Sequence, residues 1–144
     1  MTTVFLDANV FLYAIGEASP FRSACRALLE ATANGTLSAT TSSEVLQEVL
    51  HVRSRRTSAA SAVEAVRAAA SLVPEVLPVT REDVLLACDF LERHHHVGLR
   101  GRDAVHVAVM RNRSLETLVS ADADFDVLDV IKRVDPIEAV KLVR

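Results

Sequence analysis

A short apolar run near the start of the chain, Val4-Phe5-Leu6, ends directly at Asp7, and Asn9 follows two residues later. An uninterrupted apolar run of this length is typical of a strand that is buried on both faces of a parallel sheet. In open α/β sheets, the carboxyl ends of the strands form the edge at which ligands bind. The run therefore predicts a buried strand that brings Asp7 to a binding edge.

Strands and helices are predicted to alternate along the rest of the chain. Further short strands are expected at residues 37–40, 75–79, 117–119 and 130–131, with helical apolar spacing between them. This order predicts an α/β fold with a central parallel sheet of four to five strands flanked by helices. No repeat, linker or low-complexity segment divides the sequence, so residues 1–144 are expected to form a single domain.

Acidic residues recur where strands are predicted to end or helices to begin. Glu44 closes a Thr-Ser-Ser-Glu segment with the form of a capping box, and Asp103 opens a helix that is apolar almost all round. Asp122 and Asp124 follow the fourth strand. Each acid alone could be a helix cap, a favourable charge at a helix N-terminus or a turn residue. Together with Asp7, they are expected to meet at one edge of the sheet.

Carboxylates gathered at one edge raise one another's pKa unless a cation neutralises them. Ligand sets made only of oxygen favour Mg²⁺ or Mn²⁺ over zinc. These ions bind phosphate oxygens and activate water, so the pattern predicts metal-dependent phosphodiester chemistry. Three polar neighbours of the acids, Asn9, Thr41 and Ser120, could orient a ligand or a water molecule by hydrogen bonding.

Four segments in sequence order resemble the PIN domain family: Val-Phe-Leu-Asp7-x-Asn9-Val, Ser-x-Glu44-Val-Leu-x-Glu, Arg102-Asp103-Ala-Val-His-Val-Ala and Val-Ser-Ala-Asp122-x-Asp124-Phe-Asp. The size of the chain and the order of these segments are similar to those of VapC-type toxins of bacterial toxin–antitoxin modules. The resemblance runs from Thr3 to about Val134, which is nearly the whole chain.

The resemblance implies a Mg²⁺- or Mn²⁺-dependent endoribonuclease that inhibits translation by cleaving RNA. It also implies a homodimer and a cognate antitoxin whose C-terminal segment enters the acidic groove. By the same resemblance, Asp7 and Asp103 are the metal ligands and Glu44 is the second acid. The fourth acid is either Asp122 or Asp124, because members of the family differ in which one they keep.

Two other functions stay open at this point. A non-catalytic PIN-like module would bind RNA or protein without cleaving it, although acids at all four positions argue against this. A haloacid-dehalogenase-like phosphatase also carries a nucleophilic Asp at a strand end. That family has a second Asp two residues later, where this chain has Asn9, and a positioned Lys, whereas Lys132 and Lys141 both come late in the sequence.

Basic residues and histidines outside the four segments each allow two interpretations. Arg53, Arg55 and Arg56 could contact RNA phosphates or form a solvated helix end. The His94-His95-His96 run could suggest a metal site, but a solvated loop at a helix end suits it better. His106 could face the acidic groove or be packed in the core with a backbone partner.

Composition limits the cellular context. The net charge of −3 argues against a general nucleic-acid binder, so RNA affinity would depend on metal and on local arginines. No apolar run approaches the ~18 residues of a membrane span, and the N-terminal run is too short for a signal peptide. A cytoplasmic protein is expected.

Cys25 and Cys88 lie in helical patterns among Ala and Leu, which predicts two buried free thiols.

Overall fold

The computed structural model describes residues 2–144. Its centre is a five-stranded sheet in the order β3-β2-β1-β4-β5, and every neighbouring pair of strands is parallel. The strands are β1 (Val4–Leu6), β2 (Ala39–Ser42), β3 (Val76–Leu77), β4 (Thr117–Val119) and β5 (Lys132–Val134). The predicted α/β fold with a central parallel sheet is confirmed.

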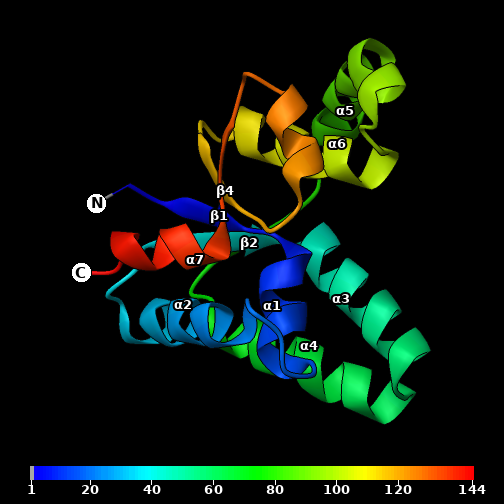
Figure 1. Cartoon of the computed structure of the whole chain (residues 1–144). Helices are drawn as coiled ribbons and strands as arrows, with labels where there is room; N and C mark the ends of the chain where they lie inside the picture. The colour runs from blue at the N-terminus through cyan, green and yellow to red at the C-terminus, as the bar shows by residue number, and fades with distance from the viewer. Residues whose placement is uncertain (1) are drawn as a thin grey trace.

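Helices cover the sheet, with α5 and α6 on one side and α1, α2 and α4 on the other (Figure 1). The α-helices found within residues 2–144 are α1 (Ala8–Ile15), α2 (Arg22–Asn34), α3 (Ser43–Arg56), α4 (Ala59–Leu72), α5 (Arg81–His94), α6 (Gly101–Asn112) and α7 (Pro136–Ala139). Three short 3-10 segments are η1 (His95–Val97), η2 (Ala123–Val127) and η3 (Val140–Leu142). None of the helices described here has the length and apolar character that crossing a membrane requires.

Strand β1 occupies the middle of the sheet, between β2 and β4. Its residues Val4, Phe5 and Leu6 are buried, as the apolar run predicted. The strand order reverses beside β1, because β2 and β3 extend to one side and β4 and β5 to the other. Ligands of open α/β sheets bind at such a reversal point, outside the carboxyl ends of the strands. Asp7 directly follows β1 and therefore stands at this point.

Strand β2 lies two residues later than the prediction at residues 37–40. It consists mostly of hydroxyl-bearing residues, which the sequence suggested as a helix cap. The structure satisfies these hydroxyls inside the sheet: Thr40 Oγ1 donates to the Glu75 carbonyl and Thr41 Oγ1 donates to the Leu6 carbonyl, each at 2.8 Å. A polar side chain with a main-chain partner is tolerated in a buried strand, so β2 extends to the start of α3.

The predicted capping box at the start of α3 is wrong. Ser42 is the N-cap, and its Oγ accepts a hydrogen bond from the Val45 N–H at 3.2 Å. Glu44 therefore lies at the second helical position, one residue too early to bond back to the cap. The start of α3 is displaced by one residue, but its buried face still carries Val45 and Val49.

Two later elements also start at different residues. Strand β5 begins at Lys132 instead of residue 130, because Lys132 is the residue that pairs with Thr117 of β4. Helix α6 begins at Gly101, so Asp103 lies in its first turn and does not open it.

The two cysteines are free thiols in different environments. Cys25 of α2 is fully buried, whereas Cys88 of α5 is exposed. The prediction of a buried thiol is right for Cys25 and wrong for Cys88, because α5 directs its neighbours Ala87 and Phe90 toward the core.

Candidate active site

Asp7 is held rigidly at the carboxyl end of β1, where it is the N-cap of α1. Its Oδ1 accepts a hydrogen bond from the Ala8 N–H at 2.8 Å. Its Oδ2 accepts from the Ser120 hydroxyl at 2.7 Å and from the Asn9 amide at 3.2 Å. Burial raises the pKa of Asp7, and the nearby His106 and these hydrogen bonds offset that rise only in part. The protein thus supplies too little positive charge to stabilise this carboxylate fully.

Asn9 and Ser120 join the end of β1 to the segment that follows β4. The Asn9 amide donates to Ser120 Oγ at 3.0 Å, and Asn9 Oδ1 accepts from the Ala121 N–H at 3.2 Å. Ser120 Oγ also accepts from the Asp122 N–H at 3.1 Å. Two of the three polar residues singled out in the sequence therefore lie directly beside Asp7.

Asp103, in the first turn of α6, shares its surroundings with three other carboxylates. Burial raises the pKa of Asp103 to about 6, and the negative charges of Asp7, Asp122 and Glu48 act in the same direction. The positive charge of His106 opposes them without cancelling them. Charges that perturb one another so strongly must lie close together, so α6, α3, β1 and the segment after β4 converge on one acidic site.

Asp122 and Asp124 are not equivalent in this site. Asp122 is partly buried at the start of η2, and its charge contributes to the raised pKa of Asp103. Asp124 is exposed, and its N–H donates to Asp122 Oδ1 at 2.9 Å. The structure therefore brings Asp122 to the other acids and leaves Asp124 at the surface.

Glu48 is an acid of the site that the sequence did not single out. Its Oε1 lies 3.1 Å from His106 Nε2, and ligand atoms of Asp7, Glu48 and His106 all lie within 4.8 Å of one another. Glu44, one helical turn earlier, forms an ion pair with Arg102 at 3.3 Å. Residues four apart share a helix face, so this spacing was the signal in the sequence that could have found Glu48.

His106 is fully buried beneath the acids and faces them. Its Nδ1 has no hydrogen-bond partner within residues 2–144, and its Nε2 points to Glu48 and lies 3.8 Å from Asp7 Oδ1. Burial lowers the pKa of His106. The hydrogen bond to Glu48 and the charge of Asp7 together raise this pKa by more than burial lowers it, so the net shift is upward. Because an ionised carboxylate oxygen can only accept, Nε2–H is the donor of the hydrogen bond to Glu48, and this bond orients that carboxylate.

The remaining predicted residues lie outside this cluster. The Thr41 hydroxyl is bonded to the Leu6 carbonyl inside the sheet, and Thr41 is fully buried. His95 and His96 are exposed in η1. The three candidate RNA-contacting arginines all lie in the last turn of α3: Arg53, Arg55 and Arg56.

The donor set of the acidic site fits a divalent cation. The raised pKa values of Asp7 and Asp103 show negative charge that the protein's own cations leave uncompensated. Carboxylate oxygens are the ligands that Mg²⁺ and Mn²⁺ prefer.

An open parallel sheet with acidic residues clustered at its strand-order reversal defines an α/β protein with an acidic site at the carboxyl edge of its sheet. Residues 4–131 match the model of the PIN domain, and the chain belongs to this family. It is similar to ribonuclease VapC13 of Mycobacterium tuberculosis, with 36% identity over 133 residues that cover 90% of this chain and 98% of that protein.

Two solved structures share the fold. Mycobacterium tuberculosis VapC20, described as a sarcin-ricin loop cleaving toxin, superposes with a TM-score of 0.72 at 24% identity, covering 86% of this chain and 93% of that one. VapBC-5 of Mycobacterium tuberculosis, a member of the VapBC family of toxin–antitoxin systems, gives 0.62 at 18% identity, covering 94% and 99%. The family match argues against a dehalogenase-like phosphatase. Asn9, which stands where that family has its second Asp, donates a hydrogen bond to Asp7 instead.

Proposed function

We propose that this chain is a metal-dependent endoribonuclease that acts as the toxin of a toxin–antitoxin pair. The observation that carries the proposal is the convergence of Asp7, Glu48, Asp103 and Asp122 at the reversal point of the sheet. The similarity to VapC13, which is named as a ribonuclease, supports RNA as the substrate. Inhibition of translation follows if the RNA that is cleaved serves protein synthesis.

We propose Mg²⁺ or Mn²⁺ as the cofactor, held by the four carboxylates. When bound, such an ion supplies positive charge that stabilises the phosphate group during its cleavage. Compared with the acids chosen from the sequence, this set replaces Glu44 with Glu48 and takes Asp122 in preference to Asp124. The interactions of Glu48 with His106 and of Glu44 with Arg102 support that choice.

The other residues of the site position the acids. Ser120 and Asn9 hold Asp7 Oδ2, and the Ala8 N–H holds Oδ1, so this carboxylate cannot rotate freely. His106 does the same for Glu48 through its Nε2 proton. Acids that are already oriented need less rearrangement when substrate binds, which is how such surrounding residues contribute to catalysis.

Cleavage of RNA by the purified protein tests the proposal. We expect cleavage in Mg²⁺ or Mn²⁺, its loss in EDTA, and its loss in Asp7→Asn and Asp103→Asn. Cleavage that survives both EDTA and Asp7→Asn would contradict the proposal. A protein that binds RNA but cleaves none in either metal is a non-catalytic module.

We further propose a homodimer and a cognate antitoxin as partners. The shared fold with a member of a toxin–antitoxin family supports an antitoxin, and the acidic site is suited to a basic segment of it. Co-purification with any small protein encoded by a reading frame adjoining this gene tests the partner, and light scattering tests the dimer. We expect a stable complex in which RNA cleavage is suppressed; cleavage that is unchanged in the complex would contradict this role.

A further inference from the structure

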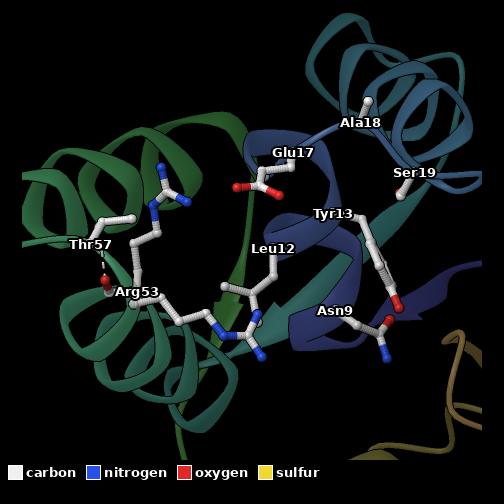
Figure 2. Close-up of a pocket in the computed structure, with 10 residues that line it drawn as sticks. Asn9, Leu12, Tyr13, Glu17, Ala18, Ser19, Arg53 and Thr57 are labelled. Atoms are coloured by element: carbon white, nitrogen blue, oxygen red, sulfur yellow. Dashed lines mark hydrogen bonds between the residues drawn. The ribbon is translucent and has the colours of Figure 1, made fainter.

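A pocket of about 580 Å³ opens beside the acidic site, between α1, the turn that follows it and the last turn of α3 (Figure 2). Its volume is in the range of small-ligand sites and would hold one nucleotide. The residues that give the pocket its chemistry are Asn9, Leu12, Tyr13, Glu17, Arg53 and Arg56. Asn9 also donates to Asp7 Oδ2 at 3.2 Å, so one residue of the pocket lining directly contacts the acidic site.

The α3 wall of the pocket carries positive charge that the protein does not neutralise. Within residues 2–144, neither Arg53 nor Arg56 forms an ion pair, although Arg113 and Arg133 elsewhere each pair with an Asp. Arg53 Nε donates to the Ser61 hydroxyl at 3.2 Å, which anchors this side chain against α4. Free guanidinium groups on a pocket wall are suited to an anionic ligand, and phosphate is the anion that Arg recognises with two hydrogen bonds.

The α1 wall carries an aromatic ring. The ring of Tyr13 packs on that of Phe21, with centroids 4.9 Å apart, and remains partly exposed beside the pocket. Figure 2 shows Tyr13 and Glu17 on the α1 side of the pocket, with Arg53 on the α3 side. A carboxylate repels phosphate but accepts hydrogen bonds from the amino groups of bases, so a base is better placed on this side.

We infer that this pocket binds the nucleotide next to the scissile phosphate of single-stranded RNA. Arg53 and Arg56 contact its phosphate, and Tyr13 stacks on its base. This inference rests on the proposed ribonuclease function and adds a substrate site to it. A protein segment is the less favoured occupant, because the pocket joins two arginines without an ion pair to an aromatic ring, and this combination matches the phosphate and the base of one nucleotide.

Binding of a fluorescent single-stranded RNA of mixed sequence tests the inference, measured by anisotropy in EDTA over a series of salt concentrations. Each phosphate contact with a single strand contributes about 0.7 to the slope of log K against log salt. We expect Arg53→Gln and Arg56→Gln each to weaken binding and to reduce this slope by about 0.7. Arg53→Lys keeps the charge and should retain the slope. Arg93→Gln, an exposed arginine in the last turn of α5, is the matched control and should change nothing.

The aromatic wall has a different signature. Stacking is worth about 1–3 kcal/mol per base, so Tyr13→Ala should weaken binding by about 5- to 150-fold without changing the salt slope, while Tyr13→Phe should bind normally. If the wild-type chain cleaves RNA but these variants bind and cleave it as wild type does, the inference fails and the proposed function stands. Loss of antitoxin binding with RNA binding intact would instead assign the pocket to a protein. A wild-type chain that cleaves no RNA contradicts the proposed function itself.

Discussion

Glu44 and Glu48 lie one turn apart on α3, yet only Glu48 reaches the buried cluster. We predict that Glu48→Gln lowers Mn²⁺ affinity by about tenfold or more, because it removes a charged ligand from the site. Arg102 Nε lies 3.3 Å from Glu44 and 4.0 Å from Glu48, but only Glu48 also faces His106, at 3.1 Å. Glu44→Gln is therefore the matched control and should retain most of the affinity. Calorimetric titration of metal-free protein with Mn²⁺ measures both. Equal losses in the two variants would show that the acids contribute alike.

The raised pKa of Asp103 predicts a gain in stability when its charge is removed. A carboxyl with a folded pKa of about 6 against an ordinary 3.8 binds its proton more tightly in the folded state. The metal-free protein therefore loses stability as pH rises from about 4 through 6, and this loss persists at neutral pH.

Asp103→Asn should abolish that loss. At pH 7.5, we expect the metal-free variant to melt about 2–4 °C above wild type, a modest shift because solvent screens part of the repulsion. In Mn²⁺ the order should reverse, since only wild type gains stability from the ion. Thermal unfolding with and without Mn²⁺, at pH 5 and pH 7.5, measures both effects. A variant less stable than wild type in EDTA would contradict the assigned repulsion.

At the scale of residues, acids that follow a strand could be assigned to the site from the sequence, whereas acids within a helix were harder to assign. Asp7 and Asp122 follow predicted strands, and Asp103 lies in a predicted helix start, so their convergence follows from a parallel sheet. Glu48 shares a helix face with Glu44, so the sequence could place an acid on that face but could not say which of the two reaches the buried cluster. His106 could be placed on its helix, but its bond to Glu48 depends on how α3 and α6 pack.

At the scale of elements, a buried carboxylate fastens α5 to α6. Asp83 Oδ2 accepts from the Thr80 N–H at 2.8 Å, completing a capping box. Its Oδ1 accepts from Asn112 at 2.7 Å and from Arg113 at 3.0 Å. Burial tends to raise the pKa of Asp83, but the bonds from Arg113, Asn112 and Thr80 lower it to about 2. This single side chain therefore ties the start of one helix to the end of the next.

Asp83→Ala should destabilise the protein by about 3–5 kcal/mol, because it leaves Arg113 without its charge partner. Asp89→Ala, on the exposed face of the same helix, should have little effect. The lowered pKa also implies that Asp83 contributes about 2 kcal/mol above pH 4, which is lost as pH falls toward 2. Urea unfolding at pH 7 and pH 3 measures both effects. An Asp83→Ala variant with the same acid sensitivity as wild type would contradict this role.

The elements themselves followed from the sequence where the apolar pattern was strong, as in β1, β4 and α4. The capping box of α5 was also readable, since Thr80 and Asp83 have the spacing it requires. Strand β2 was displaced because Thr and Ser are typical of caps, whereas here Thr40 and Thr41 bond to the Glu75 and Leu6 carbonyls and only Ser42 caps α3. Such long-range partners are set by the sheet order and leave no signal in the local sequence.

At the scale of the whole molecule, the fold makes the two thiols chemically distinct. Burial, with a smaller contribution from the charge of Asp135, raises the pKa of Cys25 to about 12. We predict that a thiol reagent modifies one cysteine per native chain, Cys88, and a second only after unfolding. Because thiolates are the reactive species, Cys88→Ser should abolish the native reaction. Rapid labelling of both thiols in folded protein would show that α2 does not stay packed as described.

The strand order has a consequence for when this chain can become active. β1 and β4 are neighbours in the sheet, although more than a hundred residues separate Phe5 from its partner Leu118. The hydroxyl that holds Asp7 belongs to Ser120, and Asp122 comes later still. A ribosome must therefore synthesise the chain as far as Asp122 before the site can assemble. If the proposed activity is correct, a nascent chain shorter than this is inactive.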